Sequence, residues 1–191
     1  ALTAWLAKDE VRLRAARLRA GADAWAAARR ATGMQVSANS LKDRERAEYV
    51  MAHSLAHALM TEVAIDCGYP ASALKERVYV LPRAPGEAIQ CGILIYTASA
   101  GNQGTLGGLV EVTRRFARVL TAALDRVGLC SGDPICSDHD PAASSDDRAL
   151  HGAACHGCLL VAETSCEARN LFLDRALLVD TVGTRGSGFF Q

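Results

Sequence analysis

The feature that most constrains the fold of this chain is a cluster of cysteines in its C-terminal third. Five of its seven cysteines lie between Cys130 and Cys166. They are spaced as Cys-x5-Cys at 130 and 136, Cys-x2-Cys at 155 and 158, and one more at 166. A Cys-x2-Cys turn delivers two thiolates to one zinc ion, which takes four thiolate or imidazole ligands at about 2.0–2.3 Å. In a reducing compartment such cysteines are more typical of metal ligands than of a disulfide scaffold. The pattern therefore predicts a Zn²⁺ lobe over residues 130–166.

The expected ligands come from distant parts of this region. Thr164, followed by Glu167, is typical of a helix start, and the first turn of a helix favours a thiolate. We therefore expect Cys166 to be the third ligand beside Cys155 and Cys158. Cys136 is the favoured fourth ligand and Cys130 the alternate, with histidines 139, 151 and 156 behind them. The expected set is Cys136, Cys155, Cys158 and Cys166.

Two other kinds of cysteine chemistry remain open. A dithiol redox pair at Cys155 and Cys158 would normally open a helix after a strand, which their flanking residues do not match. A cysteine nucleophile is less well supported, because several equivalent thiols crowd together. Cys67 and Cys91 stand in apolar elements, where we expect buried thiols with no further role.

The remaining sequence predicts an α/β fold, with a small sheet, flanking helices and the C-terminal cysteine-rich zinc lobe. Apolar spacing and capping residues indicate helices over 1–31, with a possible break at Gly21, and over 40–67, 109–127 and 164–179. The β-branched runs 76–82 and 91–98 indicate strands, the second buried on both faces. We expect a helical segment at 1–40 that belongs to a longer polypeptide, a domain at 41–182, and a frayed or externally packed tail at 183–191.

Charge and hydropathy limit the possible partners. The chain has 21 basic and 21 acidic residues, so nucleic-acid binding requires a local basic patch. The first helix offers one candidate, for which we name Arg12, Arg14 and Arg17 as possible DNA contacts. No apolar run approaches the roughly 20 residues that span a bilayer, so we expect a soluble cytoplasmic protein without a membrane partner.

A glycine-rich loop follows the second predicted strand and precedes a helix. Such a turn can present backbone N–H groups to an anion. The loop contains no lysine and is therefore not a Walker A motif, and tight packing of helix on sheet would explain its glycines equally well. The candidate anion-binding residues are Gly101, Gly104, Gly107 and Gly108.

His53 and His57 are four residues apart on one predicted helix. Two imidazoles at this spacing can share a metal ion, but Ser54 stands where a metalloprotease motif requires glutamate. We expect partnered structural histidines. The rival hypothesis is a metal-dependent nuclease or phosphodiesterase that combines them with the aspartates of residues 133–147, including Asp138; most of those aspartates are typical of turn and cap residues.

Several segments together resemble a known family. They are HSLAHALM, GYPASALKERVYV, GILIYTASAGNQGTLGGLV, GLCSGDPICSDHDP and LHGAACHGCLLVAETSCEARNLFLDRALLV. Over about residues 45–180 they resemble the C-terminal domain of DrmB proteins of the DISARM anti-phage defence system. They are also similar to the C-terminal module of MrfA-type DNA-repair helicases.

The resemblance implies a four-cysteine metal-binding module, with Cys155, Cys158 and Cys166 as ligands. It also implies action with a DrmA-like helicase partner on DNA, either directly or through that partner. No helicase or ATPase motif lies in these residues, so we expect an accessory domain rather than an enzyme.

Overall fold

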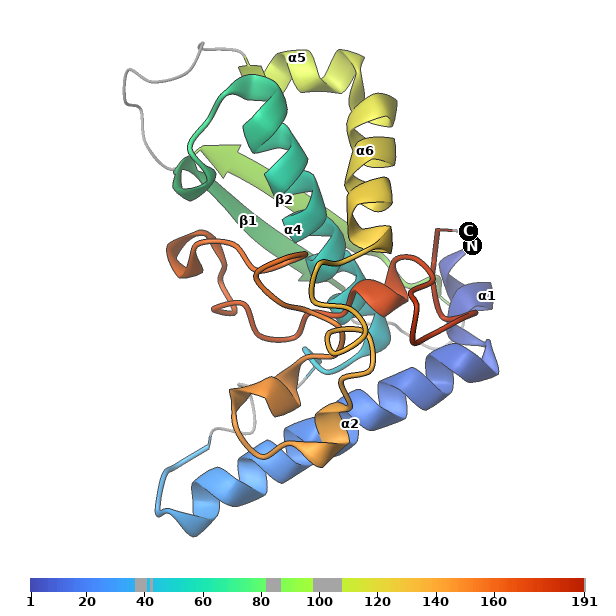
Figure 1. The fold of residues 1–191 in the computed structure, drawn as a ribbon, viewed down its shortest axis with the longest axis vertical. Coiled ribbons are helices and arrows are strands. Elements are labelled where there is room, and N and C mark those ends of the chain that lie inside the picture. The colour runs from blue at the N-terminus through green and yellow to red at the C-terminus, as the bar shows by residue number, and fades with distance from the viewer. Residues whose placement is uncertain (37–40, 42, 82–86, 98–107, 191) are drawn as a thin grey trace.

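The computed structural model describes residues 1–36, 41, 43–81, 87–97 and 108–190, and its central element is helix α4 (Ala47–Cys67). This helix is buried on nearly all sides, because residues from α6, the sheet and the C-terminal segment pack around it (Figure 1). It ends at Gly68, whose φ of 70° is the left-handed cap that glycine favours. The predicted end is thus confirmed, but the start is not: the helix begins after Arg46, and Asp43 lies in a turn. Ser40 is outside the described residues.

The two predicted strands form one antiparallel hairpin-like pair. Strand β1 (Leu74–Val80) pairs with β2 (Cys91–Thr97), with Leu74 opposite Thr97. The prediction that the second strand is buried on both faces was wrong. Its residues alternate between half-buried and exposed, because this two-stranded sheet packs on α4 and leaves Leu94 and Tyr96 exposed.

The predicted helix at 109–127 is present but divided in two. Helix α5 (Gly108–Arg114) is followed by α6 (Phe116–Gly128), and the chain turns at Arg115. Val119, Ala123 and Val127 are buried at helical spacing, and α6 packs against α4. The predicted apolar face therefore exists, but it belongs to two helices.

The N-terminal segment also forms two helices, α1 (Leu2–Leu6) and α2 (Asp9–Ala31). The break lies at Ala7 and Lys8, whereas the predicted break at Gly21 is absent from this continuous helix. Gly21 serves close packing: a Cβ at this position would stand 2.2 Å from the Ala149 carbonyl oxygen. Figure 1 shows α2 running along the base of the molecule beneath this part of the chain.

We expect Gly21→Ala to destabilise the protein by about 1–3 kcal/mol despite the higher helix propensity of alanine, because the added methyl group meets backbone. Gly128→Ala is the matched control, since a Cβ there meets nothing within 4 Å. Urea unfolding of both variants measures the difference. Equal stability of the two variants would show that α2 can move away from Ala149 at no cost.

The described residues 129–190 contain no α-helix, so the predicted helix at 164–179 was wrong. The chain instead follows turns and 3₁₀ helices: η2 (Pro141–Ala143), η3 (Asp147–Leu150), η4 (Glu163–Ser165) and η5 (Arg175–Leu177). Positive φ angles at Arg169, Asn170 and Phe172 interrupt any helix. The Asn170 side chain also bonds both backbone groups of Val161, at 3.0 and 2.8 Å. These side-chain and tertiary contacts outweigh the local helix propensity.

The tail after Val182 packs on the N-terminal helix. The indole of Trp5 donates to the Ser187 carbonyl at 2.8 Å, and its ring meets Phe189 edge-on. The Ser187 hydroxyl donates to the Ala176 carbonyl at 2.7 Å. The expectation of a frayed tail was therefore wrong for the described residues, and the two ends of the chain lie side by side (Figure 1). The predicted α/β class, with a small sheet, flanking helices and a cysteine-rich lobe, is confirmed.

Candidate metal centre

Four cysteines gather where the chain leaves α6. Their ligand atoms all lie within 4.8 Å of one another. Cys136 and Cys158 are buried, and Cys155 is half-buried. The members of this four-cysteine cluster are Cys130, Cys136, Cys155 and Cys158.

The sulfur spacing fits one tetrahedral ion. Sulfurs at about 2.3 Å from a common zinc ion are separated by about 3.8 Å. Cys158 Sγ is 3.8 Å from both Cys136 Sγ and Cys155 Sγ. Cys130 Sγ is 3.3 Å from Cys155 Sγ, which is closer than that ideal. The donor set and its geometry therefore suit a closed, structural metal site.

Backbone amides point at these sulfurs. Gly132 N–H donates to Cys130 Sγ and Gly157 N–H to Cys155 Sγ, both at 3.3 Å. Cys155 N–H donates to Cys158 Sγ at 3.2 Å. A Cβ on Gly157 would stand 2.7 Å from the Ser131 hydroxyl and 3.3 Å from Cys130 Sγ, so a larger residue there would crowd both side chains. Such donors favour the thiolate form that binds a metal.

A buried arginine supports the cluster from the other side. Arg175 donates to the Val127 carbonyl at 2.9 Å and to the Asp133 carboxylate. Hydrogen bonds with Cys158 and with Arg175 outweigh the effect of burial and together lower the pKa of Cys136 to about 5. Four thiolates around a divalent cation carry a net negative charge, and this guanidinium offsets part of it. Sequence analysis did not identify Arg175.

The structure brings together three of the four expected ligands with the alternate, Cys130. It places Cys166 in another group of side chains, and the helix expected to begin there does not form. One signal in the sequence favours Cys130: Cys130-Ser-Gly and Cys155-His-Gly share a Cys-x-Gly pattern, and both glycine amides reach sulfur. Cys155 and Cys158 lie in a turn, not at the start of a helix after a strand, which disfavours a dithiol redox pair.

The histidines expected behind Cys130 serve other contacts. His139 Nε2 bonds the Arg148 carbonyl at 2.9 Å, and its ring lies beside that of His151. Neither belongs to a described group of metal-ligating atoms, and His156 is exposed.

A second group of metal-ligating side chains is fully enclosed between α4, β1 and the C-terminal segment. His53 and His57 are 0 % exposed, Glu76 is 2 % and Cys166 is 7 %. Their ligand atoms also lie within 4.8 Å of one another. We refer to His53, His57, Glu76 and Cys166 as the histidine cluster.

The two imidazoles differ in their electrostatics. Burial disfavours a charge on His53, but hydrogen bonds with Cys166 and Glu76 outweigh it and raise its pKa to about 9. Burial, with the charge of His53 beside it, lowers the pKa of His57 to about 3. His53 therefore pairs with Glu76, whereas His57 stays neutral. The predicted structural histidines are partnered through their Nδ1 atoms, which bond the carbonyls of Phe172 and Leu159 at 3.1 and 2.8 Å.

The nuclease hypothesis requires His53 and His57 to lie close to the aspartates of residues 133–147. The described residues of the structure do not bring these side chains together. Asp133 contacts Arg175, Asp140 and Asp146 cap η2 and η3, and Asp147 accepts from Trp25 and Arg29. Capping thus accounts for Asp140 and Asp146, and contacts with distant side chains account for Asp133 and Asp147.

The other candidate contacts are dispersed. Gly101, Gly104 and Gly107 lie outside the described residues, and Gly108 is buried at the start of α5. Arg12 and Arg17 are exposed on α2, whereas Arg14 is buried against Asp174. The three arginines therefore do not form one surface.

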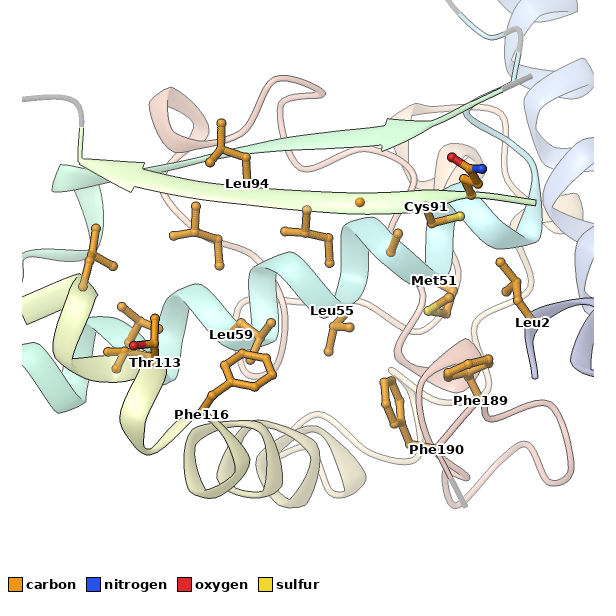
Figure 2. A pocket seen from close by; sticks show the side chains of 18 of the residues that line it. Leu2, Met51, Leu55, Leu59, Cys91, Leu94, Thr113, Phe116, Phe189 and Phe190 are labelled. Carbon is orange, nitrogen blue, oxygen red and sulfur yellow. The ribbon is translucent and has the colours of Figure 1, made fainter. Parts of the chain in front are cut away.

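An apolar cavity of about 930 Å³ lies between the sheet and the helices. Figure 2 shows side chains of β2, α4, the α5–α6 region and the C-terminal Phe189 and Phe190 gathered around it. None of the expected site residues that the structure describes lines it, so the metal-ligating groups lie apart from this cavity. Among the described helices, none has the length and apolar character to cross a membrane.

Four converging cysteines held by one small sheet and packed helices define a candidate metal-binding module. The chain belongs to the MrfA Zn-binding domain family, whose profile matches residues 55–159 and thereby includes the four-cysteine cluster.

The chain is also similar to a particular protein, DISARM protein DrmB of Bacillus paralicheniformis (strain ATCC 9945a / NCIMB 11709 / CD-2). The two are 40% identical over 153 residues, which is 79% of this chain and 26% of that protein. The chain thus spans about a quarter of the length of this curated relative.

Proposed function

We propose that this chain is the zinc-stabilised accessory domain of a DISARM defence protein, which supports assembly with a DrmA-like helicase and binding to DNA. The observation that carries the proposal is the position of the four-cysteine cluster inside the region matched by the MrfA Zn-binding family. The 40% identity to DISARM protein DrmB supports the defence context.

The proposed ligands are Cys130, Cys136, Cys155 and Cys158, in place of a set with Cys166. A zinc ion there would be structural, because all four coordination positions would be filled by protein. The chain's own residues fix the surrounding surface: Arg175 joins the end of α6 to the cysteine turns. In this proposal the domain contributes shape and charge, and ATP hydrolysis belongs to the helicase.

For DNA, we propose contact through the exposed arginines of α2. Among the described residues, the Arg12 side chain pairs with Asp9, three residues earlier on the same helix, and such exposed pairs contribute little. Arg12 and Arg17 are thus available to phosphates, whereas Arg14 is not.

The test measures the affinity of the chain for duplex DNA at several salt concentrations, with and without the DrmA-like helicase. Charge reversal of Arg12 and Arg17 to glutamate is expected to weaken binding and to lower the slope of log K against log salt by about 1 for each DNA phosphate that is no longer neutralised. Arg114→Glu is the matched control, since this side chain is 79% exposed on α5.

An unchanged salt slope would contradict contact through α2. Binding that requires the helicase would assign the DNA contact to the partner. Loss of helicase association in a zinc-depleted chain, with association restored by zinc, would support the assembly role, and association that is independent of zinc would contradict it.

A further inference from the structure

We propose that the histidine cluster is a second metal site, which binds a divalent transition-metal ion of the zinc class through His53, His57, Glu76 and Cys166. Nothing in the match to the zinc-binding family assigns it, since His53 and Cys166 lie outside the matched residues 55–159. It is independent of the four-cysteine cluster, with which it shares no residue.

The first argument is geometric. Ligands at about 2.0–2.3 Å from one zinc ion lie about 3.3–3.8 Å apart in a tetrahedron. His53 Nε2 is 3.2 Å from Cys166 Sγ and 3.4 Å from Glu76 Oε1. All four ligand atoms fall within 4.8 Å of one another. The four side chains therefore already converge on a common centre.

The second argument is the state of the buried polar atoms. His57 Nε2 and Glu76 Oε2 have no hydrogen-bond partner among the described residues, although both side chains are nearly inaccessible. A buried polar atom without a partner costs about 1–3 kcal/mol. A metal ion bound between them would provide the missing partners.

The third argument is the outer shell. In metal sites, a ligating histidine commonly donates its other ring N–H to a carbonyl or carboxylate, which fixes the ring. Here Nδ1 of His53 lies 3.1 Å from the Phe172 carbonyl, and Nδ1 of His57 lies 2.8 Å from the Leu159 carbonyl. Both rings are thereby held with Nε2 as the remaining ligand atom.

The two anionic ligands have the same kind of support. The Asn170 N–H donates to Cys166 Sγ at 3.2 Å, and the Glu167 N–H donates to Glu76 Oε1 at 3.2 Å. One thiolate and one carboxylate balance the charge of a divalent cation when both imidazoles bind as neutral ligands, which requires His53 to release the proton of its metal-free ion pair with Glu76. The site is thus electrically neutral when loaded, as its deep burial requires.

The ligand types indicate the metal. Two nitrogens, one sulfur and one oxygen form a borderline set, which suits zinc and its neighbours rather than magnesium or calcium. All four ligands are protein side chains and all are buried, so the ion would be structural. It would join α4 and β1 to the C-terminal segment around Cys166, which has no α-helix of its own to hold it.

The test counts the metal ions in the chain purified without chelators, by native mass spectrometry. We expect two ions per chain in the unmodified protein, and one in both Cys166→Ser and Glu76→Gln. Cys67→Ser is the matched control and should keep two, because Cys67 lies outside both clusters.

X-ray absorption at the zinc edge of the unmodified chain keeps the test valid if a variant does not fold. Two occupied sites predict a mixture of sulfur with nitrogen or oxygen ligands, because the histidine cluster supplies only one sulfur. A single ion with sulfur ligands alone would overturn the second site and leave the four-cysteine site intact. A single ion with mixed ligands would support the histidine cluster and overturn the four-cysteine site. A metal-free chain would overturn both sites.

Discussion

Replacing Cys158 by serine is expected to remove one metal ion per chain and to unfold the segment between Cys130 and Cys158. The Sγ atom of Cys158 lies 3.8 Å from two other sulfurs of the cluster. Structural zinc sites in small peptides contribute about 10 kcal/mol or more, which is comparable to the entire free energy of unfolding of a typical domain. The described residues of this segment form no α-helix or strand of their own, and although η2 and η3 pack on α2, the two cysteine turns have little else to replace the missing ligation.

Hydrogen exchange read by mass spectrometry checks this result. Peptides from residues 130–160 should lose protection in Cys158→Ser, while peptides of α2 should keep more of theirs. Cys67→Ser is the control, since Cys67 lies at the end of α4 outside the cluster. Full protection in Cys158→Ser together with an unchanged metal content would refute the four-cysteine site.

Acidification should release the metal in the unmodified chain, because protons compete for the thiolates.

Arg14→Leu is expected to destabilise the chain by about 3–5 kcal/mol, because it leaves a buried carboxylate without its partner. Arg14 Nε lies 2.5 Å from Asp174 Oδ2, and the two side chains are 5% and 0% exposed. Asp174 also accepts the backbone N–H groups of Ala153 and Ala176, each at 3.0 Å. The Arg14–Asp174 ion pair thus connects α2 to the chain around Ala153 and to the chain around Ala176.

Thermal unfolding measures this effect, with an expected decrease in Tm on the order of 10 °C. Arg17→Leu is the matched control, since Arg17 is exposed on the same helix and should change Tm little. Adding Asp174→Asn to Arg14→Leu should recover part of the stability, because the buried charge is then removed while the side chain can still accept a hydrogen bond. Similar Tm values for Arg14→Leu and Arg17→Leu would contradict the structural role of the pair.

Local sequence patterns were sufficient to predict the elements that have a clear apolar periodicity or a clear terminating residue. The apolar spacing before Gly68 predicted the end of α4, and the β-branched runs predicted both strands. The burial of Val119, Ala123 and Val127 follows from helical spacing alone. The break at Arg115 could not be predicted in this way, because the sequence between the two helices contains no proline or glycine.

The failures have a common cause. Residues 164–179 have good local helix propensity, yet long-range contacts decide their path: Asn170 bonds Val161, and Asp174 bonds Arg14. Arg14 looks like its exposed neighbours in sequence, and only packing shows that it is buried. In the same way, Gly21 is typical of a helix break until Ala149 is seen to pack directly against it.

The sequence by itself determined that cysteines would converge in the C-terminal third, because a Cys-x2-Cys turn brings two sulfurs together through local geometry. Only the tertiary structure decided which sulfur joins them and which does not. Sequence analysis favoured Cys166 and named Cys130 only as the alternate, whereas the structure places Cys130 in the cluster, because the fold around α6 and α4 sets where each sulfur lies. The association of Cys166 with two histidines and a glutamate from distant parts of the chain is likewise a product of packing, since no sequence spacing encodes a contact between α4, β1 and the C-terminal segment.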